Sequence, residues 1–399
     1  IQDRSFNADG SLFYPSTRAF FEGLEPSDLQ IPFIPDEGCD GAPSDVSPIW
    51  NPEFFGNVMV VNGRSWPYLE VEPRRYRFRL LNGCNSRFLL LRLDNDASFW
   101  QIGSDGGFLP APVELDSLLL GPAERADVIV DFGGLPEGTE IVLLNLAPDE
   151  PFGGGVPGRD FEPSDPETTG QVMKFVVVPA TGDDPSTHPL NLRLPVITPL
   201  GAGHTVRRLS LNEEESATVR VLPPEGEDEG WVTPVVLACD DPGAVPFGPI
   251  EARLGTMDQL NNPVSMRWED AITENPGIGG PEVWEFYNFT ADAHPIHIHE
   301  IQFQVMDRQA LAVDEEGMSI KPAVVVGEAW PPVPGETGFK DTVIAYPGQV
   351  TRVRVKFGVG GLYVWHCHIV EHEDNEMMRP LFVGNPSGYP VLLRIESGS

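Results

Sequence analysis

The histidines of this chain are distributed unevenly, and their placement constrains the fold more than any other feature. Eight histidines occur in 399 residues, and six of them lie in two short segments. The first is His294-Pro295-Ile296-His297-Ile298-His299, and the second is His366-Cys367-His368-Ile369-Val370-Glu371-His372, followed by Met377. Imidazole and thiolate groups gathered in this way are metal ligands. The fold is therefore expected to bring two distant segments side by side.

The spacing of these residues fits β-strands. Because successive side chains of a strand point to opposite faces, His297 and His299 share one face. His366 and His368 likewise share a face, and Cys367 points to the other one. A single short strand can therefore hold two metal sites back to back, joined by a covalent path of a few bonds. Such a path suits electron transfer between the two sites.

The ligand types on the cysteine side predict a blue-copper site. A thiolate, two imidazoles and a weak thioether form the trigonal blue-copper centre, whose potential is tuned by the axial ligand. Cys367, His372 and Met377 are close in sequence, and His294 can reach the same place from the other segment. On the opposite face four imidazoles converge, a set suited to copper that handles dioxygen. Zinc is the competing metal, but one cysteine among six histidines does not resemble its structural sites, which are often rich in paired cysteines.

The rest of the chain predicts an all-β fold. The 41 glycines and 41 prolines follow no period and fit many short strands joined by turns. Short stretches of alternating apolar and polar residues recur, and long helical periodicity is absent. This pattern favours sandwiches or barrels. The clearest stretches are Tyr76-Arg77-Phe78-Arg79-Leu80, Ala126-Asp127-Val128-Ile129-Val130, Trp284-Glu285-Phe286-Tyr287 and Val350-Thr351-Arg352-Val353-Arg354-Val355.

The chain also reads as two weak copies of one unit. In the first copy a strand ending at Asn82 is followed by another that reaches Phe132. In the second copy a strand ending at Asn288 is followed by another that reaches Phe357. The second copy carries the clustered histidines and the first carries none. The repeat predicts two domains of similar architecture, only one of which binds metal.

A passage rich in Pro, Gly and Asp separates the two copies and predicts the domain boundaries. We expect residues 1–180 to form a domain without copper ligands, residues 181–206 to form a linker, and residues 207–399 to form the domain with the ligands. His188 and His204 lie in or beside this linker and are interpreted as exposed side chains.

The charge of the chain argues against some classes of partner. Its 60 acidic and 26 basic residues give a formal net charge of −34, a field that repels nucleic acid and anionic membranes. We therefore expect neither as a partner. The charge is interpreted as a solubilising surface or as adaptation to a saline medium. No apolar run is long enough to span a membrane.

The four cysteines form no disulfide framework. Cys367 is a metal-ligand candidate and Cys84 reads as a buried thiol. Cys39 and Cys239 could pair, although nothing in the sequence shows that they do. The sequence does not determine the cellular compartment, and an extracellular or periplasmic location is slightly favoured over a cytoplasmic one. The first residues, Ile1-Gln2-Asp3-Arg4, look like the interior of a β-strand and not like its beginning. We therefore expect the true N-terminus to lie elsewhere.

Both metal-ligand motifs resemble those of the multicopper oxidases. The likeness covers most of the chain and points to the bacterial laccases of the spore-coat type, with phenoxazinone synthase and bilirubin oxidase as relatives. The family has three cupredoxin domains, and this chain resembles the second and third. The resemblance implies two cupredoxin-like Greek-key sandwiches and a first domain that is absent from the chain. The further matching segments are Asp9-Gly10-Ser11-Leu12-Phe13-Tyr14-Pro15, Val61-Asn62-Gly63, Trp66-Pro67-Tyr68-Leu69-Glu70-Val71, Gly103-Ser104-Asp105-Gly106-Gly107 and Pro122-Ala123-Glu124-Arg125.

The resemblance implies a role for each residue of the motifs. Met377 is preferred over its neighbour Met378 as the axial ligand, and Met378 is then expected to point the other way, into the core. Glu373 matches an acidic residue thought to relay protons toward dioxygen, and its other interpretation is a solvated loop carboxylate. The implied ligands are His294, Cys367, His372 and Met377 for the type 1 copper, His297 for the type 2 copper, and His299, His366 and His368 for the type 3 pair.

The chain departs from the family in one large respect. The trinuclear cluster of the family takes four of its histidines from two His-x-His motifs of the first domain, and no such additional motif exists here. We expect an N-terminal cupredoxin domain, on a separate or cleaved chain, to supply them. An exposed half-cluster would otherwise leave imidazoles without partners. The alternative is an electron-transfer fragment that keeps the blue copper and has lost oxygen chemistry.

The activity implied by the resemblance is that of a laccase, a benzenediol:oxygen oxidoreductase. Small phenolic or aromatic donors would give up single electrons near His372, whose imidazole edge is expected to lie closest to the surface. Electrons would pass from Cys367 through His366 and His368, and dioxygen would be reduced to water. A cuprous or manganous metal oxidase is a competing hypothesis and would want methionine-rich or acidic elements near the type 1 copper. The 8 methionines form no cluster, which argues against the cuprous version.

Overall fold

The computed structural model describes residues 1–15, 37–46, 51–222, 237–315 and 317–385. Short strands dominate the described residues, which confirms the all-β class. The four alternating stretches fall inside β6 (Arg75–Leu81), β11 (Arg125–Asp131), β19 (Pro281–Asn288) and β24 (Gln349–Lys356). Burial alternates along most of β11 and β24, because one face of each strand packs on the main core of its sandwich. The single α-helix of the described residues is the short α2 (Val370–Glu373).

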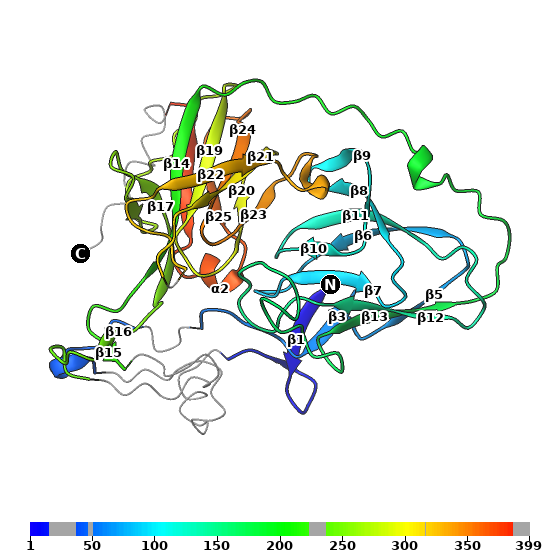
Figure 1. Ribbon diagram of the computed structural model, residues 1–399, viewed down its shortest axis with the longest axis horizontal. Coiled ribbons are helices and arrows are strands. Elements are labelled where there is room, and N and C mark those ends of the chain that lie inside the picture. The colour runs from blue at the N-terminus through cyan, green and yellow to red at the C-terminus, as the bar shows by residue number, and fades with distance from the viewer. Residues whose placement is uncertain (16–36, 47–50, 223–236, 316, 386–399) are drawn as a thin grey trace.

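The strands of residues 1–15 and 51–177 form what we call the N-terminal sandwich (Figure 1). One sheet has the order β10 (Leu118–Leu120), β7 (Leu89–Leu93), β12 (Glu140–Asn145), β13 (Gln171–Val177) and β5 (Tyr68–Val71). A second sheet has the order β6, β11, β8 (Phe99–Ser104) and β9 (Gly107–Leu115), and a smaller one has the order β2 (Leu12–Phe13), β1 (Gln2–Phe6), β3 (Val58–Val61) and β4 (Arg64–Ser65). The inward faces of the two larger sheets share one core, to which Leu91, Val128 and Phe175 contribute.

The described strands of residues 205–214 and 251–383 form the C-terminal sandwich. Its larger sheet has the order β18 (Pro263–Ser265), β17 (Glu251–Met257), β14 (Thr205–Glu214), β19, β24, β21 (Gln304–Leu311) and β22 (Val325–Trp330). Its smaller sheet has the order β23 (Thr342–Ala345), β20 (His294–Ile298), β25 (Gly361–Cys367) and β26 (Met378–Val383). Trp284 and Trp365, both fully buried, meet edge-to-face between the two sheets with ring centroids 6.1 Å apart. Cys367 belongs to the same core cluster.

The two sandwiches repeat one corner motif at the positions where the sequence repeat was seen. Asn82 and Asn288 are both fully buried at the ends of the corresponding strands β6 and β19. Each side-chain amide donates to a carbonyl oxygen a few residues ahead and to the carbonyl oxygen of Leu120 or Ala345, at 2.8–3.0 Å. Because a buried amide must satisfy its donors, both corners are held in the same way.

A long extended segment joins the two sandwiches and runs along the outside of the molecule between β13 and β14 (Figure 1). It contains the 3-10 helix Pro189–Asn191. His188 is half-buried against Trp100, with ring centroids 5.7 Å apart, so its interpretation as an exposed side chain is wrong. The reason is an apolar patch on β8 that this segment covers with Leu192 and Leu194. His204 is exposed, as expected.

A disulfide joins two segments that are far apart in the sequence. Cys39 and Cys239 are bonded, so the pairing that the sequence left open is present. Cys39 begins the 3-10 helix Cys39–Gly41, which lies beside the small sheet of β15 (Arg220–Val221) and β16 (Val245–Pro246). Cys84 is a free buried thiol, as expected. No helix among the described residues is long and apolar enough to cross a membrane.

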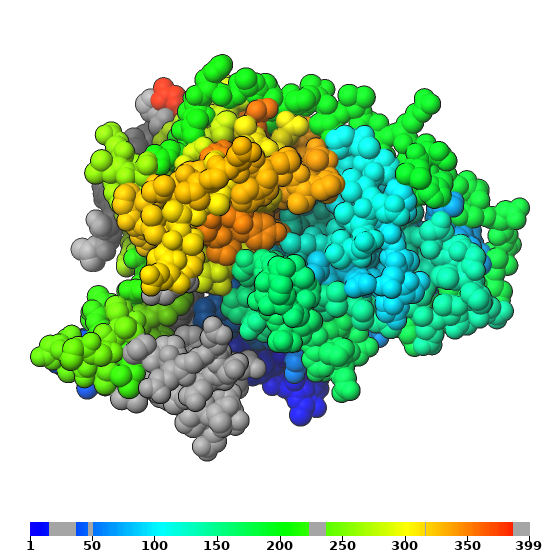
Figure 2. All heavy atoms as spheres, in the orientation of Figure 1, coloured from blue at the N-terminus to red at the C-terminus, as the bar shows by residue number. Residues whose placement is uncertain are grey.

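The two sandwiches touch along one side, which Figure 2 shows as the boundary between the cyan N-terminal strands and the orange C-terminal ones. Phe88 and Phe152 of the N-terminal sandwich join the core cluster of the C-terminal one, with ring centroids 4.7 Å apart. The Phe152 carbonyl accepts the backbone N–H of Ala293, the residue before His294. The first sandwich therefore supports the strand that begins the first histidine motif.

Candidate metal centre

Pairing of β20 with β25 brings the two histidine motifs together. The strands are antiparallel, with Ile296 opposite Cys367 and His297 opposite His366. Both are internal strands of the smaller sheet, so their backbone groups are paired on each side. Side-chain alternation then sends Cys367 and His366 to opposite faces. Two clusters of potential metal ligands result, one on each side of β25.

The inner cluster contains Cys367, His294 and His372. The sulfur of Cys367 lies 3.6 Å from Nδ1 of His294 and 3.9 Å from Nδ1 of His372, and the two Nδ1 atoms are 3.3 Å apart. All three side chains are buried. Met377 is fully buried in the same core cluster, and its carbonyl accepts the Cys367 N–H. Met378 is half-buried and pairs with His366, so the expectation that it points into the core is wrong.

Hydrogen bonds orient the His294 ring. Its Nε2 lies 2.7 Å from the Thr290 hydroxyl oxygen. That hydroxyl donates to Oδ1 of Asn288 at 2.7 Å, so it accepts from Nε2–H and leaves a lone pair on Nδ1. Burial lowers the pKa of His294 well below its ordinary value and that of His372 to about 4. Both rings are therefore neutral at neutral pH, the form that binds metals.

His372 is covered, contrary to the expectation that its imidazole edge lies closest to the surface. Its side chain is buried, and its ring hydrogen-bonds the backbone of Pro52, which as a proline offers only its carbonyl oxygen. Nε2 of His372 lies 3.8 Å from Oε1 of Glu53. The covering segment, residues 51–54, is fixed by a hydrogen bond from its last N–H to the Ser86 hydroxyl. A segment remote in sequence thus occupies the space above the ring.

The outer cluster consists of four imidazoles. Rings of His297 and His299 are 5.0 Å apart, and His366 lies 5.2 Å from His299 and 5.3 Å from His368. The Nε2 atoms of His299 and His366 face each other at 3.2 Å. Burial and the neighbouring imidazoles lower the pKa of His299. Three of the four rings are only half-buried, so this face is partly open.

The two clusters are linked through the backbone of β25. Nδ1 of His366 lies 2.9 Å from the carbonyl oxygen of Cys367 and 3.1 Å from a carboxylate oxygen of Glu373. Burial alone would raise the pKa of Glu373, but the His366 hydrogen bond and the nearby imidazoles lower it overall. Glu373 is therefore an ionised carboxylate beside the outer cluster rather than a solvated loop side chain.

Comparisons with known proteins point to one family. Residues 249–387 match the family described as multicopper oxidase. The chain is 39% identical over 388 residues to a laccase of Bacillus subtilis, covering 97% of this chain and 62% of the relative. A laccase of Bacillus stratosphericus is 40% identical over 390 residues, with 96% and 62% covered. Among solved structures, McoA multicopper oxidase of Aquifex aeolicus superposes with a TM-score of 0.61 at 25% identity, covering 96% of this chain and 64% of that one.

In residues 249–387 the chain belongs to the multicopper oxidase family. It spans 62% of the length of the two Bacillus laccases. The cofactor of multicopper oxidases is copper, and the inner cluster fits it. A buried thiol between two neutral imidazoles, with a buried methionine in the same core cluster, is the donor set of a blue-copper site. Burial raises the pKa of Cys367, so the thiolate form needs a metal ion beside it.

Three residues near the two clusters were not found from the sequence. Thr290 contacts His294, Glu53 contacts His372, and Asp341 contacts His297. Thr290 lies between the corner asparagine and the first histidine motif, and that position could have drawn attention to it. Glu53 and Asp341 lie far from the motif residues they contact and follow no ligand-like spacing.

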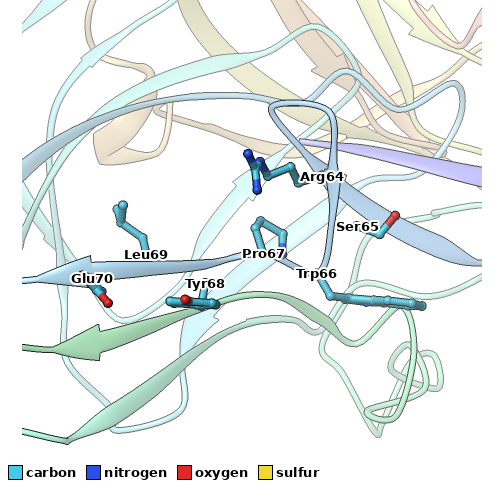
Figure 3. A pocket seen from close by; sticks show the side chains of 7 residues that line it. All are labelled: Arg64, Ser65, Trp66, Pro67, Tyr68, Leu69 and Glu70. Carbon is cyan, nitrogen blue, oxygen red and sulfur yellow. The ribbon is translucent and has the colours of Figure 1, made fainter.

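A surface pocket of the N-terminal sandwich lies away from both clusters (Figure 3). It has a volume of about 770 Å³ and is lined by seven consecutive residues, 64–70, at β4 and β5. Trp66 and Tyr68 are exposed there. The lining contains no histidine, cysteine or methionine, so we assign it no part in the metal centre.

Proposed function

We propose that this chain is the type 1 copper-binding part of a laccase-type multicopper oxidase. In this proposal it oxidises phenolic or aromatic donors by one electron at a time and reduces dioxygen to water. The observation that carries the proposal is the division of ligands across β25. Cys367 lies with His294 and His372 on one side, and His366 lies with His297 and His299 on the other.

The inner cluster would receive the electrons. His294, Cys367, His372 and Met377 would hold type 1 copper, which supplies a one-electron acceptor when bound. The buried setting of these side chains excludes water and favours a fixed geometry in both oxidation states. A phenol that loses an electron also loses its proton, giving a phenoxyl radical. The donor would dock over the segment 51–54, because that segment covers the edge of His372.

The backbone of β25 would carry the electrons onward. From the sulfur of Cys367 the path runs through its own peptide to His366 and His368, and the contact between His366 Nδ1 and the Cys367 carbonyl gives a second, shorter connection. Four electrons and four protons convert one dioxygen molecule to two waters. Glu373, ionised and 3.1 Å from His366, would accept protons and pass them toward the outer cluster.

The outer cluster would hold part of the dioxygen-reducing centre. His297 would serve the type 2 copper, and His299, His366 and His368 the type 3 pair. The remaining ligands would come from an N-terminal cupredoxin domain outside residues 1–399. Two observations support this: the imidazole face is partly open, and the Bacillus laccases are longer than this chain.

Copper binding and oxygen consumption of the complete protein test the proposal. With a dimethoxyphenol as donor we expect a blue absorption band, non-blue copper, and one dioxygen consumed for every four phenols oxidised. Residues 1–399 alone should show the blue band and no oxygen consumption. A complete protein that takes up zinc instead of copper, or that releases peroxide in place of water, would contradict it.

A divalent metal oxidase is a second candidate, because acidic side chains lie beside the inner cluster. Glu53 is buried next to His372, and its charge interacts with those of Glu213 and Asp292. Burial and the charge of Asp292 raise the pKa of Glu213 to about 8, and burial raises the pKa of Asp292 to about 6. A bound divalent cation would relieve this repulsion between carboxylates.

Substitution of Glu213 separates the two candidates. If a divalent cation is the donor, Glu213→Gln should lower the rate of Mn(II) oxidation and leave the rate with the dimethoxyphenol unchanged. Glu214→Gln, at the half-buried neighbouring position, is the matched control. Equal rates with Mn(II) in all three proteins would exclude the cation-binding role.

We further propose an extracellular or periplasmic location. Disulfides persist in oxidising compartments and are rare in the cytosol, and Cys39 and Cys239 are bonded here. Cell fractionation of the source organism checks this, and reduced thiols at both positions in protein taken directly from cells would contradict it.

A further inference from the structure

The N-terminal sandwich binds the segment that precedes β23 through buried ion pairs and a backbone hydrogen bond. Nζ of Lys340 lies 2.9 Å from a carboxylate oxygen of Asp105 and 3.0 Å from one of Glu124, and all three side chains are buried. The Gly106 N–H donates to the Phe339 carbonyl at 2.9 Å, and a Cβ at Gly106 would lie 2.4 Å from that oxygen. Only glycine permits this approach. The position of residues 339–342 is therefore fixed from the sandwich that contains no histidine.

Arg125 continues this contact to Asp341. Both terminal nitrogens of Arg125 donate to the two carboxylate oxygens of Asp341, one of them at 2.8 Å. The backbone N–H of Arg125 donates to Asp105 at 2.7 Å, so the arginine is itself held. A bidentate arginine–carboxylate pair fixes direction as well as distance.

Asp341 in turn holds His297. Nδ1 of His297 lies 2.7 Å from the Asp341 carbonyl oxygen and 3.5 Å from its carboxylate, and the Thr342 hydroxyl is 3.2 Å away. A carbonyl oxygen can only accept, so Nδ1 carries the hydrogen. The lone pair of the neutral ring is then on Nε2, the atom that a metal ion needs. Partners of this kind fix both the tautomer and the orientation of a metal-binding histidine.

We propose that Arg125, acting through Asp341, is a positioning residue for the copper ligand His297. The sandwich without histidines would thus take part in building the outer copper cluster, although none of its side chains binds copper. This inference rests on the proposed function, namely that copper occupies the four-histidine face in the complete protein.

The test uses the complete, copper-loaded protein with Arg125→Gln, Asp341→Asn and the double variant. Non-blue copper is followed by electron paramagnetic resonance during titration with a copper chelator, and blue copper by its absorption. Loss of such a supporting partner weakens metal affinity by about 10–100-fold. We expect this loss for non-blue copper in each single variant, with blue copper unchanged. Because both residues act through one contact, the double variant should be no weaker than Asp341→Asn alone.

Arg77→Gln is the matched control, since Arg77 forms an exposed ion pair with Asp127 in the same sheet. This control variant should bind blue and non-blue copper as the parent protein does. The inference would be overturned if Arg125→Gln kept its full affinity for non-blue copper, or if the losses of affinity added up in the double variant. It would also be overturned if blue copper were lost in parallel. If the unmodified complete protein binds blue copper and no non-blue copper, the proposed function fails, and this inference fails with it.

Discussion

In the N-terminal sandwich β7 lies between β10 and β12, and in the C-terminal sandwich β20 lies between β23 and β25. The strand registers match as well, because the corner asparagines reach Leu120 and Ala345, which occupy corresponding positions. The residue pairs that correspond in the two sandwiches are Leu89 and His294, Arg92 and His297, Leu144 and His366, and Asn145 and Cys367.

Asn145 and Cys367 show how one backbone position serves two purposes. The backbone N–H two residues ahead donates to Oδ1 of Asn145 at 3.1 Å and to the sulfur of Cys367 at 3.4 Å. Asn145 also binds the Leu90 N–H and the Ser164 hydroxyl, so its polar atoms are satisfied within the protein. Cys367 instead faces two imidazole nitrogens. The backbone plan is shared, and a few side chains decide whether the site can bind a metal.

The outer faces differ in a similar way. Arg92 is exposed and pairs with Asp96 at the surface. His297, at the corresponding position, faces three other imidazoles and is held by Asp341. A charged surface pair needs no further partner, whereas a half-open group of imidazoles has unused ligand atoms. The C-terminal sandwich is therefore specialised on both faces of one strand.

The largest expected effect comes from removing the thiolate of Cys367, whose counterpart in the N-terminal sandwich is Asn145. Cys367→Ser should abolish the blue absorption and all turnover, because no other sulfur of comparable donor strength is in the inner cluster. Absorption and oxygen-uptake measurements check it, and phenol oxidation that persists in this variant would refute the electron path. Asn145→Cys, the reciprocal change, should create no blue site, since Leu89 stands where His294 would be needed.

The corner asparagines provide the next test. Asn82→Ala and Asn288→Ala should each lower the free energy of unfolding, by about 1–3 kcal/mol for every buried polar group left without a partner. Chemical denaturation measures this. Only Asn288→Ala should also shift the blue band, because Asn288 holds Thr290 and Thr290 orients His294. A shift of the same size in Asn82→Ala would show that the two corners are not separate supports.

A moderate effect is expected at the axial position. Met377→Leu should keep copper bound and raise the reduction potential, because a weak thioether donor is lost. Redox titration of the blue band measures the change. Met378→Leu is the matched control, since Met378 is half-buried and pairs with His366 rather than lying in the core. An unchanged potential in Met377→Leu would mean that the axial ligand was chosen wrongly.

The smallest effect concerns the buried arginines, Arg87 in the N-terminal sandwich and Arg308 in the C-terminal one. Glu336 forms two hydrogen bonds with Arg308, at 2.6 and 2.7 Å. Burial would raise the pKa of Glu336, but Arg308 lowers it overall below 4.5. The stability from this pair is therefore present above about pH 4.5 and is lost as the pH falls through the folded-state pKa.

Unfolding measured against pH checks this sign. The difference in unfolding free energy between the parent and Glu336→Gln should be constant above about pH 5 and should narrow in acid. Asp149→Asn is the corresponding test for Arg87. The charge of Arg87 lowers the pKa of Asp149, although burial of Asp149 alone would raise it. A difference in unfolding free energy that becomes larger in acid would contradict the stabilising role assigned to these two ion pairs.

Much of the fold and of the candidate site could be predicted because the relevant signals are local. Alternation along β11 and β24 predicted strands, since side chains of a strand alternate between faces. The same rule predicted that Cys367 and His366 point to opposite sides, and the ligand types predicted copper. The division into two domains and a linker, and the role of each ligand, stay predictions.

The sequence by itself determined the all-β class, the two histidine segments and the repeat, because each is a pattern within a few residues or between similar stretches. Only the tertiary structure decided that residues 51–54 cover His372, that Cys39 pairs with Cys239, and that Arg125 reaches Asp341. These contacts join residues that are distant in the chain. No local pattern encodes such contacts, because they depend on how the packed strands and loops meet in space.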